Sequence, residues 1–160
     1  MNKSIGLVFL LNLFVTILGA QQIESDTAES NLVIIDRADR IRRLLTQENT
    51  EMLILTGDVL MHQDSLFMSC DSARKEGNNL LAVGDVILQQ WDSLNVFSHR
   101  LAYNGNTKDA YLRDSVVLQS KDQKLFTDSL AYNTETQIAI YNQGAILTND
   151  TTTLYSQRGI

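Results

Sequence analysis

Residues 101–104 read Leu-Ala-Tyr-Asn, and the same four residues return at 130–133, which is 29 positions later. The tripeptide Gly57-Asp58-Val59 likewise returns as Gly84-Asp85-Val86, which is 27 positions later. Self-similarity at a fixed period of this length is typical of repeat architectures, in which a single unit cannot bury its apolar face alone. These stretches therefore predict a fold made of stacked, similar units.

Two series of small or turn-forming residues give the length of the unit. The first series is Ala38, Ala73, Ala102 and Ala131, with Gly159 as the next small residue; the second is Gly57, Gly84, Asp114 and Gly144. Spacings within both series run from 27 to 35 residues, so we expect about four units of about 29 residues each.

Within each unit the apolar residues alternate with polar ones, which is the period of a β-strand. Polar turns rich in Asp, Asn, Ser or Gln separate the alternating runs, as antiparallel hairpins require. The predicted inward-facing residues are Val59, Met61, Leu66, Met68, Val86, Leu88, Leu94, Val96, Val116, Leu118 and Leu125. In the later units the same reasoning places Thr127, Ile146, Thr148, Leu154 and Ser156 inside, which makes that end more polar.

The stretch from Asp36 to Glu48 is ambiguous. Its arginines and leucines are compatible with a turn of helix, but Ala38 aligns with the later strand alanines. We therefore predict a strand and a turn here.

Composition excludes several classes of protein. Apolar residues make up 44% of the chain, which is too many for a disordered polymer. The net charge of −6 and the scattered Arg and Lys residues do not provide the basic footprint of a nucleic-acid-binding protein. The chain has no Pro, which suits unbroken strand ladders because Pro cannot donate to them.

The first twenty residues have the parts of a secretory signal peptide: Lys3 supplies positive charge, an apolar run follows, and Leu18-Gly19-Ala20 ends in small residues. The alternative is a membrane anchor, but a run of about fourteen residues is shorter than the roughly 20 that a span needs. We expect cleavage of residues 1–20, a flexible lead-in over 21–32 and a β-domain over 33–160. The chain stops at Ile160 just as a fifth unit begins, which is compatible with truncation of a longer protein.

No cluster of residues predicts catalysis or metal binding. Cys70 is alone and is interpreted as a small buried hydrophobe rather than a redox thiol. Asp-Ser occurs five times, but neither His62 nor His99 pairs with these positions. A role of Asp and Ser in turns at the ends of strands therefore explains these pairs better than a catalytic nucleophile or a calcium site does. Trp91 and the tyrosines fit cross-strand packing better than a carbohydrate surface. We expect no enzyme activity, no metal and no cofactor.

The ordered motifs resemble a known family. Leu55-Thr56-Gly57-Asp58-Val59, Cys70-Asp71-Ser72-Ala73, Val83-Gly84-Asp85-Val86 and the two Leu-Ala-Tyr-Asn segments are similar to the OstA-like/LptA family, in particular its Bacteroidota type. The resemblance covers about residues 33–160. It implies an all-β jellyroll of stacked antiparallel strands in the periplasm, with a role in lipopolysaccharide transport. The eleven inward residues named above would then contact acyl chains.

The resemblance also implies partners. Jellyroll edges in that family join end to end as a bridge, so we expect pairing with other jellyroll proteins, head-to-tail self-association and association with the outer membrane. The alternatives are an assembly scaffold that holds no lipid and an enzyme built on a β-solenoid. A carrier should leave an apolar trough open along its length, whereas a scaffold should have a closed interior.

Overall fold

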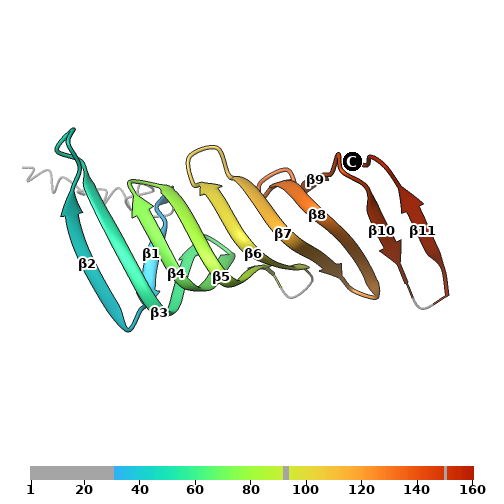
Figure 1. Cartoon of the computed structure of the whole chain (residues 1–160), viewed down its shortest axis with the longest axis horizontal. Coiled ribbons are helices and arrows are strands. Elements are labelled where there is room, and N and C mark those ends of the chain that lie inside the picture. The colour runs from blue at the N-terminus through green and yellow to red at the C-terminus, as the bar shows by residue number, and fades with distance from the viewer. Residues whose placement is uncertain (1–30, 92–93, 150) are drawn as a thin grey trace, which may run out of the picture.

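The computed structural model describes residues 31–160 except 92, 93 and 150, and these residues form eleven strands in one antiparallel sheet (Figure 1). The strands are β1 (Ile34–Arg37), β2 (Arg40–Leu45), β3 (Glu51–Gln63), β4 (Leu66–Glu76), β5 (Asn79–Gln90), β6 (Leu94–Asn104), β7 (Asp109–Ser120), β8 (Gln123–Asn133), β9 (Ile138–Ile140), β10 (Ala145–Thr148) and β11 (Thr153–Ser156). This confirms the all-β jellyroll and the strands predicted within residues 36–48. The predicted signal peptide and most of the predicted lead-in lie outside the described residues.

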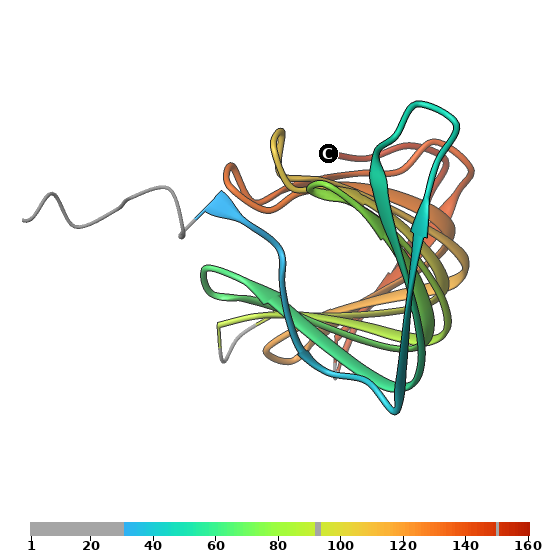
Figure 2. The same ribbon diagram turned by 90° about the vertical axis from the view of Figure 1, so that its left-hand side faces the viewer.

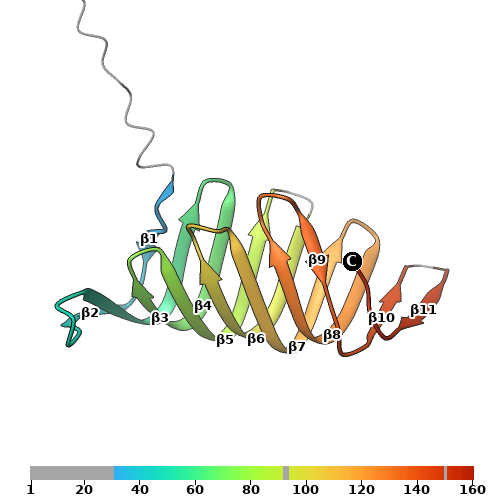
Figure 3. The same ribbon diagram turned by 90° about the horizontal axis from the view of Figure 1, so that it is seen from above.

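Consecutive strands stack along the long axis of the molecule (Figure 3). Their order is β1-β3-β4-β5-β6-β7-β8-β10-β11, with β2 also paired to β3 and β9 also paired to β8. We call β3–β4, β5–β6, β7–β8 and β10–β11 the first to fourth rungs. These four rungs are the repeated units that the sequence predicts.

Every long strand bends near its middle, and this bend gives the sheet its shape. Pairing shifts register at the bend, for example between Thr56 and Val59 of β3. The bend residues are the predicted anchor series Gly57, Gly84, Asp114 and Gly144, all with positive φ (77°, 81°, 67° and 83°). Because glycine adopts this conformation without steric cost, it recurs at the bend. We call the line of bends the corner.

The corner divides the sheet into two arms that fold toward each other, so that the section is an open C (Figure 2). The first arm comprises β1, residues 59–63, 66–70, 86–90, 94–98, 116–120 and 123–127, β10 and β11; the second arm comprises β2, residues 51–56, 72–76, 79–83, 100–104, 109–113 and 129–133, and β9. Side chains alternate between the inner and outer face of each arm. The core lies between the two inner faces.

The corner explains why Asp114 stands where the other rungs have glycine. A Cβ at Gly57 would collide with the carboxylate of Asp39, and one at Gly84 would collide with that of Asp71. At the third rung the facing residue is His99 instead, and Asp114 forms an ion pair with Arg100. A side chain is therefore accommodated there, and the Arg100 hydrogen bond lowers the pKa of the Asp114 carboxyl.

Two sequence alignments were wrong by one residue, which moves a side chain to the opposite face of a sheet. Ala73 pairs with Ala82, which pairs with Leu101, so Ala73 shares the inner face with Leu101 and not with Ala102. Ala102 and Ala131 lie on the outer face.

The second error concerns the fourth rung. Ala145 pairs directly with Thr127, so one residue fewer follows the bend there than in the first three rungs. Ala145 and Leu147 consequently face inward, and Ile146 and Thr148 face outward, opposite to the prediction.

Candidate functional site: the interior and its seam

The eleven inward residues predicted for the first three rungs all lie on the inner face of the first arm. Nine of the eleven are buried, and the remaining two, Leu94 and Leu118, are half-buried against the same core. Cys70 continues this face; burial raises the pKa of its thiol to about 11, which fits the predicted structural role. Thr127 is also inside, where its hydroxyl donates to the carbonyl of Gly144 at 2.8 Å.

The second arm supplies the other half of the interior, which the sequence analysis did not name. Its buried residues are Leu55, Ala73, Leu80, Ala82, Leu101, Tyr103, Ala110, Leu112, Leu130 and Tyr132. The alternation of apolar residues on this side of the bends contained a signal for the second arm. It includes Leu101 and Leu130, which are the first residues of the repeated tetrapeptides. The interior is therefore apolar on both sides, from β3 to β10.

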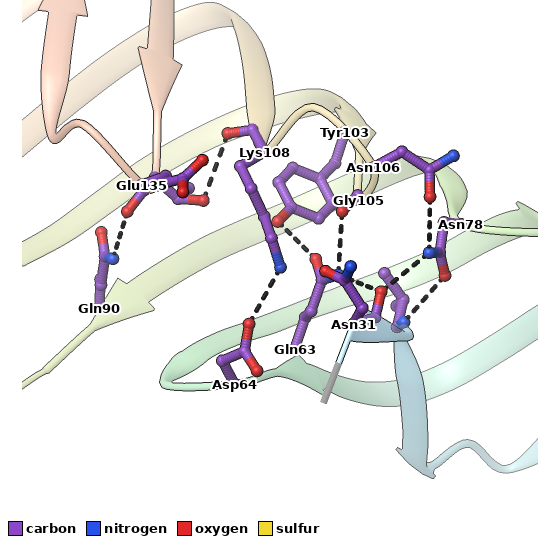
Figure 4. Close-up of polar contacts among 12 residues, drawn as sticks. Asn31, Gln63, Asp64, Asn78, Gln90, Tyr103, Gly105, Asn106, Lys108 and Glu135 are labelled. Carbon is purple, nitrogen blue, oxygen red and sulfur yellow. Dashed lines mark hydrogen bonds and ion pairs between the residues drawn. The ribbon is translucent and has the colours of Figure 1, made fainter. Parts of the chain in front are cut away.

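The free ends of the two arms meet along a line opposite the corner, which we call the seam. Two glutamines from the first arm reach across it to two tyrosines of the second arm. Figure 4 shows the first of these pairs, Gln63 with Tyr103. The Tyr103 hydroxyl donates to Gln63 Oε1 and the Tyr132 hydroxyl donates to Gln90 Oε1, both at 2.6 Å. We call these pairs the first and second latch.

Each latch also reaches the backbone of the opposite turn. Gln63 Nε2 donates to the carbonyls of Gly105 at 3.0 Å and Asn31 at 2.6 Å, and Gln90 Nε2 donates to that of Thr134 at 2.6 Å. Both glutamines are buried, at 1% and 6% exposure. The side-chain nitrogen and oxygen of each glutamine thus both have a hydrogen-bond partner, as buried polar atoms require.

Burial also fixes the protonation state of the latch tyrosines. It raises the pKa of Tyr103, and it raises the pKa of Tyr132 to about 12. Both phenols therefore remain hydrogen-bond donors at neutral pH. Beside the first latch, Lys108 Nζ lies 2.9 Å from Asp64 Oδ2, which adds an ion pair across the seam.

The first arm of the third rung contributes no glutamine to a latch, although the second arm of this rung contributes Tyr132 to the second latch. In the row that contains Gln63 and Gln90, pairing places Ser120 at the end of β7. Within the described part of the chain, Ser120 makes no side-chain hydrogen bond across the seam. A cavity of about 270 Å³ opens here, lined by Gln90, Trp91, Leu94, Leu118, Ser120, Tyr132, Gln137 and Ala139. The half-buried Leu94 and Leu118 are thus reached through the seam.

In residues 31–160, outside the three undescribed positions, no three His, Cys, Asp or Glu side chains are arranged to hold a metal ion. His62 faces Asp36, with 2.8 Å between Nδ1 and Oδ2, and His99 lies at the corner. No helix in this described part is long and apolar enough to cross a membrane.

A bent antiparallel sheet with an apolar interior and a polar seam defines the class of this protein as a stacked β-jellyroll. The model of the OstA-like protein family matches residues 30–160, so the chain belongs to that family. It is also similar to a solved structure, that of LptH from Pseudomonas aeruginosa, described as the LptA homologous periplasmic component of the lipopolysaccharide transport device. The TM-score is 0.59 at 16% identity, over 69% of this chain and 82% of that chain, and this likeness shows the shared fold. A comparison with curated proteins finds no match.

Proposed function

We propose that this chain binds the acyl chains of lipopolysaccharide between its two arms, as one component of a periplasmic bridge toward the outer membrane. The observation that carries the proposal is the continuous apolar interior from β3 to β10. Membership of the OstA-like family and the described role of LptH support it. The eleven inward residues of the first arm would contact the acyl chains, and the sugar part would stay outside the seam.

Entry of an acyl chain requires the arms to separate, because the interior is filled by its own side chains. Hiding a methylene from water contributes about 0.8 kcal/mol, so a chain of about 12 carbons gains on the order of 9 kcal/mol. A typical hydrogen bond contributes only about 0.5–1.5 kcal/mol net, so breaking one latch costs much less than this gain. Entry would begin beside Ser120 at the end of β7, which contributes no latch.

The two ends of the stack would provide the contacts with neighbouring bridge proteins. Among the described strands, β2 and β11 each have a single paired neighbour, so each presents an unpaired edge. Such an edge accepts a strand from another chain. We propose edge pairing with other jellyroll proteins and head-to-tail self-association by the same route.

Transport in this proposal is passive. Acyl chains would slide along the interior while a transporter elsewhere supplies the energy, so no catalytic step is needed. The chain would reach the periplasm through a cleaved signal peptide over residues 1–20.

One observation favours the second candidate function, an assembly scaffold without a lipid ligand. The interior is closed over the first two rungs, where Val59, Met61, Val86 and Leu88 are at most 1% exposed. A trough open along its whole length was expected of a carrier. A carrier can have this closed interior if the latches open when an acyl chain enters.

Site-specific photocrosslinking in cells tests the proposal. A photoreactive residue at Leu118 or Leu94 should give lipopolysaccharide adducts, because both side chains face the interior beside the seam cavity. Val117 is the matched control, because its side chain lies on the outer face of the same strand, one residue from Leu118. A photoreactive residue there should give no adducts. Lack of adducts at both Leu94 and Leu118 in cells rich in the protein would reject the carrier and leave the scaffold.

A further inference from the structure

The outer face of the second arm concentrates positive charge on an acidic protein. The chain has a net charge of −6, yet five of its eight arginines lie on this face. They are Arg40, Arg42, Arg74, Arg100 and Arg113. Among the described residues only Arg100 of these five has an ion-pair partner, Asp114. Glu76 and Asp109 also lie on this face, so its arginines outnumber its carboxylates.

A groove with an apolar lining runs along β6 on this face. The small outward side chain of Ala102 forms its floor, and Leu81 of β5 and Tyr111 of β7 form its walls. These walls are 44% and 54% exposed. A cavity of about 570 Å³ occupies the end near the corner, and one of about 350 Å³ that shares the same three residues continues toward the seam.

Two arginines stand at the corner end of the groove. Arg100 and Arg113 are direct cross-strand partners on β6 and β7. Like charges directly opposite each other in a sheet are destabilising. Asp114 compensates Arg100 through a hydrogen bond of 2.8 Å to Nη2 and a second contact to Nε, whereas Arg113 is left without an ion pair among the described residues. An anion beside Arg113 would relieve this repulsion.

The outer face of the first arm provides an internal contrast. It carries a larger groove of about 730 Å³, lined by Val117, Phe126 and Ile146 among others. Its lining includes Asp128 but no Arg or Lys. Arginines therefore line the groove on the second arm, whereas no Arg or Lys lines the groove on the first arm.

We infer that the outer groove over Ala102 binds a phosphate-headed lipid amphiphile, with the head group on Arg113 and Arg100 and the alkyl chain between Leu81 and Tyr111. A guanidinium suits a phosphate because it offers several donors in a planar fork. An alkyl chain suits the groove because it covers the exposed walls. This site is separate from the interior and does not depend on the proposed function.

The test uses the purified protein and dodecyl phosphate that carries a photoreactive diazirine in its alkyl chain, followed by peptide mapping. We expect adducts on Leu81 and Tyr111. Arg113→Gln should reduce this labelling at least about tenfold, because a charged hydrogen bond is lost. Lys124→Gln is the matched control: it removes one positive charge from the outer face of the first arm and should leave labelling unchanged.

Several outcomes would overturn the inference. Equal loss of labelling in both variants would indicate only a general attraction between charges. Adducts confined to Leu94 and Leu118 would place the amphiphile in the interior instead. Equal protection by inorganic phosphate would indicate a site for the anion alone, and equal protection by a polyglutamate peptide would indicate an acidic protein partner. Equal labelling by a photoreactive alkyl phosphocholine of the same chain length would show that the site does not require a head group with net negative charge.

Discussion

The first two rungs and the third rung share one backbone plan but differ at both ends of their arms. At the corner, the first two have Gly57 and Gly84 under an aspartate, and the third has Asp114 paired with Arg100. At the seam, the first two end in Gln63 and Gln90, and the third ends in Ser120. A repeat can therefore keep its strand pairing while the connections between the arms change.

This difference predicts where the two arms should separate. Sheet hydrogen bonds join each rung to its neighbours throughout. Across the seam, the side-chain contacts between the arms among the described residues are the latches, the Lys108–Asp64 ion pair and the hydrogen bonds of Asn78 to the backbone of Asn31 and Val33. Only one side of the third rung is latched: Tyr132 of β8 bonds Gln90, whereas Ser120 of β7 bonds no residue across the seam among those described. We expect the arms to separate there first.

The largest expected effect is at the corner. Gly84→Ala should lower the free energy of unfolding by about 2–4 kcal/mol, because a Cβ is strained at positive φ and overlaps Asp71. Asp114→Gly should change it far less than Gly84→Ala does, since it removes an exposed ion pair and eases the backbone. Urea unfolding of both variants checks this. Similar losses of unfolding free energy in the two variants would show that the bends at Gly84 and Asp114 do not differ in this way.

The seam should show the next largest effect. Gln90→Ala leaves the Tyr132 hydroxyl and the Thr134 carbonyl without partners, which should cost about 2–3 kcal/mol in total, at the lower end of about 1–3 kcal/mol for each buried group. Ser120→Ala removes no such bond and should stay within about 0.5 kcal/mol. The same urea titration measures both. A loss in the Ser120 variant as large as in the Gln90 variant would contradict the difference between the rungs.

The second latch should also give the protein a dependence on alkaline pH. The pKa of Tyr132 is raised to about 12 in the folded protein, whereas a free tyrosine has a pKa of about 10. Between these values the unfolded chain binds fewer protons than the folded one, so the free energy of unfolding falls as the pH rises from about 10 to 12. Tyr132→Phe should lose this part of the decline. Urea unfolding at pH 8, 10 and 11 should therefore show the gap between the two proteins narrowing, and a constant gap would count against a buried phenol.

The smallest effect concerns access from solvent. In a Cys70→Ala background, a cysteine at Leu118 should react with a maleimide at least about tenfold faster than one at Met61, because only the former lines the seam cavity. Both positions belong to the inner face of the first arm, so they are matched in environment. Equal rates would show that the first rung opens as readily as the third.

Much of this fold was predictable, because two signals in the sequence are local. Alternation identified the inward residues of the first arm, and the Gly57, Gly84, Asp114 and Gly144 series marked the bends. Errors arose where a single residue decides the face: Ala73 and Ala102 are both small, but the first fits the interior and the second the floor of an outer groove. Tetrapeptide matching cannot separate these two reasons for a small side chain.

The latches were missed for a different physical reason. Tyr103 and Gln63 are 40 residues apart, and Tyr132 and Gln90 are 42 apart, on arms whose approach depends on the bend. One signal was present, since Gln63 and Gln90 are spaced like Gly57 and Gly84 and occupy inward positions of their strands. A polar residue that recurs on an apolar face requires a polar partner on the facing wall.

The bends also make the convex edge of the molecule a line of negative charge. Six carboxylates follow it, and only two of them form an ion pair among the described residues, Asp58 with Arg37 and Asp114 with Arg100. The six are Asp39, Asp58, Asp71, Asp85, Asp114 and Asp128. Neighbouring strands lie about 4.8 Å apart, well within a screening length of about 30 Å at 0.01 M salt and still within about 8 Å at 0.15 M. Added salt should therefore stabilise this fold, and each rung added to the stack should make that dependence steeper.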